Sequence, residues 1–476
     1  MIFLKGLWFY VITLLNLKTC YGFFHFEGDH HLRDVSPPKG EVIVIAEATM
    51  TQPLDHFDSA ENRTWEMYYH YFNYEHFKPG GPLVLYLGNH PFGSFSVLYN
   101  YVIMNFAREV NATVMMPEHR FYDKSVPNGD VSVENLAYLS STQALADLKN
   151  FIEYIKREDR YKNSKVVVFG GSYSGNLAAW ARMLYPDLVD AALSSSAPQL
   201  AKSDFYEYLE VVGDLFKKYG SSACYEKVAE KFQRYEKLLQ SDEAIKQLKK
   251  EHSICKWTDM KVLENQHTFF YHKISDFSNW IKLHNPTRIQ NYCNHIITSN
   301  SSIHDWKWNK QLQFDNSYPI CFNYDFADMI EDIKENVYFK PWLYQTCTEF
   351  GYMESTSSNN HPFTNNLPVS FFYKMCTGVF GPEFDQARME DGVKKTNEKY
   401  GGRTPNADRV VFVNGDMDPW HKLGVLTDLS DEAPARVIPD AGHCSDLWIF
   451  DEDDKPEKVA EVREFTKKKL KEWIGM

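Results

Sequence analysis

The sequence lacks the features that mark several classes of protein. Its 476 residues contain no run of lysine and arginine, and the formal net charge is -13 at pH 7. Binding to nucleic acid requires concentrated positive charge, so no nucleic-acid partner is expected. The cysteines show no Cys-x-x-Cys pair and no Cys/His spacing typical of zinc. We therefore predict no metal site and no cofactor.

Long apolar stretches are also scarce. One occurs at residues 7–17, after Lys5 and before small or polar residues that end at Gly22. This pattern is typical of a secretory signal peptide, and a buried helix or an uncleaved anchor is the alternative interpretation. The run is too short for a comfortable membrane span, so no stable membrane anchor is predicted. Residues 1–22 are expected to be a signal peptide, which directs the chain into the secretory pathway.

Cysteine and asparagine positions agree with export. The secretory pathway is oxidising, so most cysteines that remain after Cys20 leaves with the signal peptide should form disulfides. Cys444 stands apart from the others and is the candidate for an unpaired thiol. The disulfide candidates are Cys224, Cys255, Cys293, Cys321, Cys347 and Cys376. Three acceptor sequons predict glycosylation at Asn62, Asn111 and Asn300.

Strand and helix patterns divide the chain into three parts. Buried-strand patterns alternate with helical patterns in residues 23–203, which predicts a mostly parallel sheet with helices on both faces. In residues 204–404 the pattern becomes helical and rich in aromatic residues and cysteine, including an amphipathic helix over 223–252. Buried-strand patterns return in residues 405–476. We therefore predict an α/β core in two parts, interrupted by a large helical insertion stapled by disulfides.

A serine lies at one of the strand-to-helix junctions. The sequence VVVFGGSYSGN at residues 166–176 places Ser172 between a buried strand and a helix, among very small residues. This arrangement is typical of a nucleophile elbow, in which a sharp turn raises the serine above the sheet. It predicts Ser172 as a nucleophile and the N–H of Tyr173 as an oxyanion donor. The usual pattern is G-x-S-x-G, and here Ser174 replaces the second glycine.

A nucleophilic serine needs a base and an orienting carboxylate. In hydrolases of this architecture the chain order is serine, then aspartate, then histidine. Asp416 and Asp418 follow a predicted strand, and His443 follows them in a loop. Spacing alone does not choose between the two aspartates.

The motifs around these residues resemble those of the serine peptidases that include lysosomal Pro-X carboxypeptidase, dipeptidyl peptidase II and thymus-specific serine protease. The matching stretches include TQPLDHF, EHRFYDKSVP, GGSYSGNLAAW, YQTCTEFGY, NGDMDPWHKLG and GHCSDL, and two of them are most similar to the thymus-specific branch. The resemblance implies an α/β-hydrolase core with a helical cap and a triad of Ser172, Asp418 and His443. It also implies hydrolysis of peptides near proline, from one end of the chain.

Two positions depart from the family pattern. Gly88 is followed by Asn89, His90 and Pro91, without the acidic residue that the family usually has in this loop. The same loop normally supplies a second oxyanion N–H, which we assign to Asn89. Asp123 replaces a usual glycine, and aspartate tolerates a positive φ better than most residues.

The sequence thus predicts a secreted or lysosomal serine exopeptidase that acts through an acyl-enzyme. Its expected partners are peptide substrates that contain proline. The oligomeric state considered for the protein is a homodimer. An esterase or lipase on the same core is an alternative. A catalytically silent binding protein, suggested by the altered Asn89–His90 loop, is another.

Overall fold

The computed structural model describes residues 43–74, 80–88, 102–282, 286–298, 321–447 and 457–476. The predicted signal peptide lies outside the described residues, and so do Asn89 and Asn300. No helix in the described ranges is long and apolar enough to cross a membrane.

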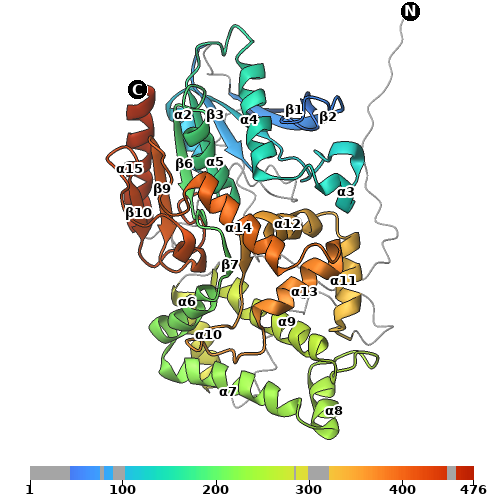
Figure 1. Cartoon of the computed structure of the whole chain (residues 1–476). Coiled ribbons are helices and arrows are strands. Elements are labelled where there is room, and N and C mark those ends of the chain that lie inside the picture. Colours follow the sequence, from blue (N-terminus) through green and yellow to red (C-terminus); the bar gives the residue numbers. More distant parts are fainter. Residues whose placement is uncertain (1–42, 75–79, 89–101, 283–285, 299–320, 448–456) are drawn as a thin grey trace, which may run out of the picture.

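The core is a sheet in the order β1-β2-β4-β3-β5-β6-β9-β10 (Figure 1). Strand β2 pairs antiparallel with β1 and β4, and every other neighbouring pair is parallel. The strands are β1 (Ile43–Pro53), β2 (Thr64–Tyr74), β3 (Leu83–Leu87), β4 (Thr113–Pro117), β5 (Val166–Gly171), β6 (Ala191–Ser195), β9 (Val410–Gly415) and β10 (Ala435–Ile438). The mostly parallel sheet confirms the predicted α/β-hydrolase class.

The central strands are buried on both faces because alternate side chains point to opposite sides. In β3, Leu83 and Leu85 join one hydrophobic cluster, whereas Val84 and Tyr86 join the other. Helices α4 and α5 contribute to the first cluster, and α2 and α15 to the second. The helices of the core are α2 (Val102–Glu109), α3 (Val133–Leu136), α4 (Ser141–Ile155), α5 (Tyr173–Leu184) and α15 (Glu457–Ile474).

The segment after β4 is fixed by a buried ion pair. Arg120 is fully buried and donates to both carboxylate oxygens of Asp147, at 2.6 and 2.8 Å. The paired geometry and the burial make this a rigid anchor for the loop. Asp123 in the same loop has φ 53°, so the residue that replaces the usual glycine does adopt the left-handed region.

The chain between β6 and β9 forms the helical part of the molecule. Figure 1 shows most of its helices gathered below the sheet, connected to it through β7 (Lys202–Asp204). The helices are α6 (Glu207–Leu215), α7 (Ser222–Leu238), α8 (Asp242–Glu251), α9 (Leu263–Lys282), α10 (Pro286–Thr298), α11 (Phe326–Glu335), α12 (Phe339–Gln345), α13 (Val369–Phe380) and α14 (Gln386–Tyr400). The boundaries at 203/204 and 404/405 stay predictions.

The prediction of a single helix over 223–252 is wrong, because the stretch contains two helices. The structure divides this stretch into α7 and α8. Ser241 lies between them in an extended conformation, and its side chain accepts a hydrogen bond from the N–H of Ala244 at 3.3 Å. A serine cap of this kind starts a new helix even though the apolar pattern continues.

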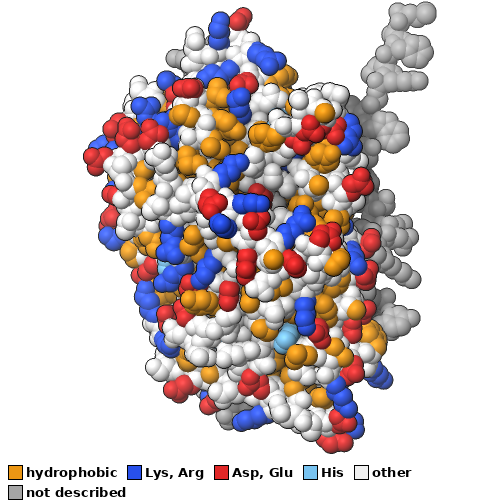
Figure 2. Space-filling model, viewed as in Figure 1, with side chains coloured by type: hydrophobic (Ala, Val, Ile, Leu, Met, Phe, Trp, Pro, Cys, Tyr) orange, Lys and Arg blue, Asp and Glu red, His pale blue; other side chains and the backbone are white. Residues whose placement is uncertain are grey.

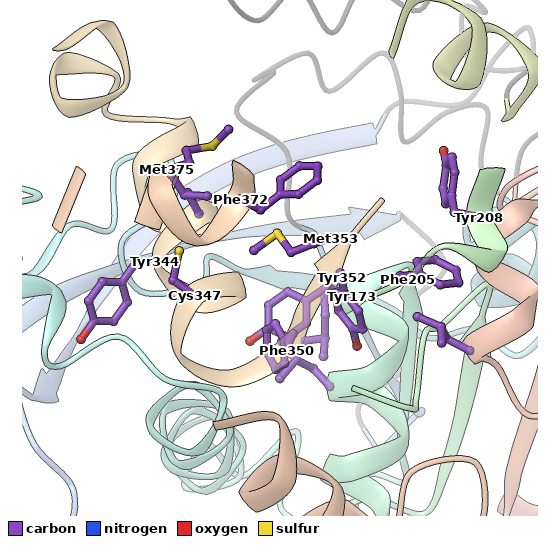
Figure 3. Packing of buried hydrophobic residues seen from close by; sticks show 14 of the residues in the cluster. Tyr173, Phe205, Tyr208, Tyr344, Cys347, Phe350, Tyr352, Met353, Phe372 and Met375 are labelled. Carbon is purple, nitrogen blue, oxygen red and sulfur yellow. The ribbon is translucent and has the colours of Figure 1, made fainter. Parts of the chain in front are cut away.

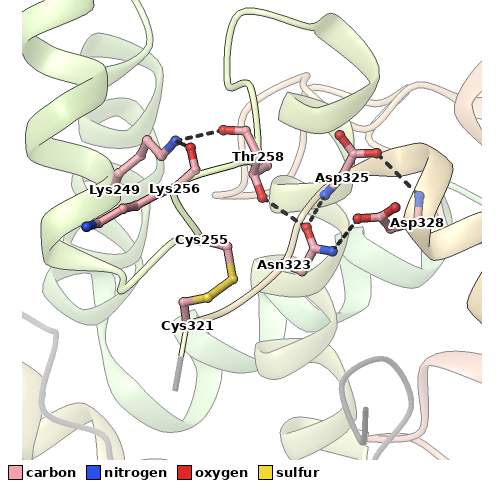
Figure 4. The surroundings of a disulfide bond; sticks show 8 residues. All are labelled: Lys249, Cys255, Lys256, Thr258, Cys321, Asn323, Asp325 and Asp328. Atoms are coloured by element: carbon pink, nitrogen blue, oxygen red, sulfur yellow. Dashed lines mark hydrogen bonds between the residues drawn. A yellow bond between two sulfur atoms is a disulfide. The ribbon is translucent and has the colours of Figure 1, made fainter. Parts of the chain in front are cut away.

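All six disulfide candidates are paired. The bonds join Cys224 to Cys293, Cys255 to Cys321 and Cys347 to Cys376, and Cys444 remains a buried thiol. Figure 4 shows the second bond beside a hydrogen-bonded chain that includes Thr258, Asn323 and Asp328. This bond therefore joins the segment after α8 to the segment that leads into α11.

On the face drawn in Figure 2, charged side chains of one sign do not form a patch. Acidic and basic side chains are mixed over it (Figure 2). This distribution agrees with the absence of a basic tract in the sequence.

Candidate active site

Ser172 occupies a strained turn between β5 and α5. Its backbone angles are φ 57° and ψ -133°, a conformation that L-residues rarely adopt. A Cβ on Gly170 would lie 1.9 Å from the carbonyl oxygen of Ser174, and one on Gly175 would lie 2.9 Å from that of Ser195. The small neighbours are therefore a steric requirement of the turn. Ser174 fits in place of the second glycine of the pattern, as a buried residue of α5.

Asp418 and His443 form a hydrogen-bonded pair. Asp418 follows β9 and is fully buried, and its Oδ2 lies 2.7 Å from Nδ1 of His443. The other carboxylate oxygen accepts from the N–H of Trp420 at 3.1 Å, which holds the carboxylate in place. Since an ionised carboxylate only accepts, Nδ1 carries the proton and Nε2 is left to accept one.

Asp416 has a different role from its neighbour. Its carboxylate accepts from the N–H of Asp440 at 2.7 Å and forms an ion pair with Lys218. It thus stabilises the turn after β10 and does not contact His443. The structure therefore pairs the histidine with Asp418, a choice that spacing alone did not make.

The environment of His443 stabilises the imidazolium that forms when Nε2 accepts a proton. Burial alone would lower the pKa of His443, but the negative charge of Asp418 and the hydrogen bond to it raise the pKa well above the ordinary value of 6.5. A histidine in this setting is a strong proton acceptor, because the imidazolium that forms is stabilised by the buried carboxylate.

The loops that carry Ser172 and His443 meet at the end of β6. The N–H of Ser172 donates to the carbonyl of Ser195 at 2.8 Å, and the N–H of Cys444 donates to Oγ of Ser196 at 2.9 Å. A Cβ on Gly171 would lie 3.0 Å from Sγ of Cys444. The residue before Ser172 therefore packs against the residue after His443, at the carboxyl edge of the parallel strands.

Tyr173 is fixed by residues that the sequence analysis did not identify. Its ring is buried, and Figure 3 shows it close to Phe350 and Tyr352. The Nε2 of Gln345, at the end of α12, donates to the Tyr173 hydroxyl at 3.0 Å. Gln345, a residue of the helical part, therefore holds the side chain of Tyr173 in place. Tyr173 is the residue whose backbone N–H is the predicted oxyanion donor. In the sequence, the only indication that Gln345 has a role at the site was its place in the YQTCTEFGY motif.

His119 completes this network. Burial lowers the pKa of His119 to about 4, so its ring is neutral near pH 7. Its Nδ1 lies 2.7 Å from the carbonyl oxygen of Arg120, which can only accept a hydrogen bond. Nδ1 therefore carries the proton, and Nε2 accepts from the Tyr173 hydroxyl at 3.2 Å.

The structure describes two of the three predicted glycosylation sites. Asn62 and Asn111 are both exposed, which leaves room for a glycan at each. Whether either is modified stays a prediction, as does the role of Asn89.

Comparison with known proteins identifies the family. The family described as Serine carboxypeptidase S28 matches residues 52–466. The chain belongs to this family. It is a serine-type peptidase with peptide substrates, as the resemblance implied.

Two relatives illustrate the range of this S28 peptidase family. Thymus-specific serine protease of Mus musculus is 30% identical over 465 residues, which cover 91% of this chain and 89% of that protein. Lysosomal Pro-X carboxypeptidase of Homo sapiens is 28% identical over 448 residues, covering 89% and 87%. A proline iminopeptidase of Mycobacterium smegmatis, with a solved structure, aligns over 89% of this chain and 99% of its own at 12% identity and a TM-score of 0.33. That structural likeness carries no functional argument.

Proposed function

We propose that this S28 peptidase is a secreted or lysosomal exopeptidase that hydrolyses peptide bonds near proline, with Ser172, His443 and Asp418 as its catalytic triad. The observation that carries the proposal is the buried 2.7 Å contact between Asp418 and His443, in a loop that packs against the nucleophile elbow. The matched family and the Pro-X relative support the peptide chemistry.

The proposed reaction begins with acylation of the serine. Nε2 of His443 removes the proton of the Ser172 hydroxyl as Oγ attacks the carbonyl carbon of the scissile bond. The N–H of Tyr173, at the first turn of α5, and an N–H from the Asn89 loop donate to the oxyanion. The tetrahedral intermediate then collapses, and His443 protonates the departing amine.

Water completes the proposed cycle. His443 takes a proton from a water molecule that attacks the acyl carbon, and the Ser172 oxygen leaves with that proton. Throughout the cycle Asp418 remains ionised and holds the imidazole in the tautomer that both steps require.

Aromatic rings beside the catalytic pair support the proline preference. The Trp420 ring, two residues after Asp418, is partly exposed. Its centroid lies 5.4 Å from those of Phe205 and Tyr352 and 5.5 Å from that of Tyr208. Phe205, Tyr208 and Tyr352 are buried and back the Trp420 ring, whose exposed part suits a flat apolar ring like that of proline, because such a contact removes apolar area from water without requiring a hydrogen-bond partner.

A substrate panel tests this proposal. Short peptides with an internal proline and free ends should be hydrolysed, whereas the same peptides blocked at both ends should resist. Replacing proline by a larger residue should lower kcat/KM by about 10-fold or more, the effect of losing one well-fitted apolar contact. Faster hydrolysis of unactivated fatty-acyl esters than of every peptide would favour the esterase alternative.

A further inference from the structure

Ser195, the last residue of β6, contacts both the turn that carries Ser172 and the loop that carries His443. Its carbonyl accepts from the N–H of Ser172 at 2.8 Å, and its hydroxyl donates to Oδ1 of Asp446 at 2.5 Å. Asp446 lies three residues after His443 in the same loop. Ser195 is therefore bonded to the nucleophile turn through its backbone and to the histidine loop through its side chain.

The bond between Ser195 and Asp446 lies in the interior of the protein. Both side chains are buried, and Oδ2 of Asp446 has no hydrogen-bond partner among the described residues. Burial raises the pKa of Asp446, whereas the hydrogen bond from Ser195 acts in the opposite direction and so favours the ionised carboxylate. A buried acceptor that loses its donor costs free energy, because no water replaces the bond. The two groups should therefore stay in contact and fix the loop relative to β6.

Two helices also hold the backbone of this loop. Arg463 of α15 donates from Nε to the carbonyl of Asp446 and from Nη2 to that of Ser445, both at 2.9 Å. Figure 1 shows α15 alongside β9 and β10. The N–H of Val102, the first residue of α2, donates to the carbonyl of Leu447 at 3.1 Å. These contacts should keep the loop folded when its bond to β6 is removed, so that the loop shifts and does not unfold.

Two serine side chains join the loop to β6 and the residue that follows it. Oγ of Ser196 accepts from the N–H of Cys444 at 2.9 Å, next to the bond between Ser195 and Asp446. One bond fixes the residue directly after His443, and the other fixes the residue two positions further on. A single bond would let the loop rotate about it, whereas two bonds fix both the position and the orientation of the imidazole.

We propose that Asp446 is a positioning residue of the triad, which by accepting from Ser195 holds the His443 loop in register with the nucleophile turn. The inference rests on the proposed function and adds a fourth side chain to it. Asp446 acts through Ser195 and the loop, and not on the substrate. Proton transfer from Ser172 requires a close and aligned base, and a misplacement of about 1 Å can lower a rate by about 100-fold.

The rate of labelling by a fluorophosphonate tests the inference, because this reagent needs the aligned serine and histidine. Asp446→Ala should lower the labelling rate constant, and kcat for a proline-containing peptide, by on the order of 10- to 100-fold, with KM within about two-fold. Ser195→Ala should give a similar loss. The double variant should lose no more than the larger single loss, because both changes remove the same bond. Asp446→Asn, whose amide oxygen can accept from Ser195, should stay within a few-fold of the wild type.

Two readouts separate positioning from folding. The number of adducts per chain and the thermal midpoint report the folded fraction, whereas the rate constant reports the alignment within the folded enzyme. Ser445→Ala is the matched control, because Ser445 is buried in the same loop and its hydroxyl donates within the loop, to the carbonyl of Gly442 at 2.9 Å. This variant should stay within a few-fold of the wild type. Should Asp446→Ala not fold, Ser195→Ala gives the result with a smaller change.

Three results would overturn the inference. The first is a wild-type rate constant per labelled chain in Asp446→Ala and Ser195→Ala, whatever the fall in the labelled fraction. The second is a double variant whose loss is the product of the two single losses, since the residues would then act independently. The third is an equal loss in Ser445→Ala. In each case, labelling of the wild type at Ser172 would leave the proposed peptidase function standing. A folded wild type that is not labelled would overturn both.

Discussion

Replacing Ser172 by alanine is expected to lower kcat for a proline-containing peptide by on the order of 10⁶. The hydroxyl supplies the attacking oxygen, and no other group in the proposed mechanism can form the acyl-enzyme. The backbone of the elbow is set by Gly170, Gly171 and Gly175, so the variant should keep its fold and its thermal midpoint. The measurement is the ratio of the two kcat values, obtained by steady-state kinetics with each enzyme concentration taken from the protein mass.

Ser174→Ala is the matched control for this change. Ser174 lies two residues away in the same helix, is buried, and its hydroxyl has no hydrogen-bond partner among the described residues. Its removal should leave kcat within a few-fold of the wild type. Equal activity of Ser172→Ala and the wild type would refute the role of Ser172.

Replacing Asp418 by asparagine is expected to lower kcat by roughly 10⁴ at neutral pH. The amide has nearly the same shape, but its NH₂ group can donate to Nδ1 of His443 and so favours the tautomer with the proton on Nε2. That tautomer cannot accept the proton of Ser172. The measurement is kcat/KM on the same peptide, compared with Asp416→Asn.

Asp416→Asn should retain most of the activity, because Asp416 contacts Asp440 and Lys218 and not the histidine. The pH dependence adds a second readout. The charge of Asp418 raises the pKa of His443, so the acid limb of kcat/KM in the Asp418→Asn variant should move to lower pH. A larger loss in Asp416→Asn than in Asp418→Asn would show that the wrong aspartate has been assigned.

The sheet and the elbow were predictable because they depend on local sequence. Strand β5 is a run of β-branched and aromatic residues, and the two glycines that follow allow the turn at Ser172. The last β-strand and the loop with His443 could be found in the same way, since β10 is short and three of its four residues, Ala435, Val437 and Ile438, are apolar. These features require no knowledge of which segments are neighbours in space.

The contacts between distant segments were not predictable in this way. Six cysteines allow 15 pairings, and only the packing of the helices selects the one observed. The bond from Gln345 to Tyr173 spans 172 residues, and no local pattern in the sequence indicates that these two side chains meet. The choice of Asp418 over Asp416 likewise depends on how the loop after β9 turns, because both residues have the same chemistry.

Labelling with a fluorophosphonate tests the central claim most directly, since this reagent reacts only with an activated serine. The account predicts one adduct per chain on the wild type, located at Ser172 by mass spectrometry of the digested protein, and a greatly reduced rate in His443→Ala. A folded wild-type protein that takes up no reagent, or that carries the adduct on another residue, would contradict it.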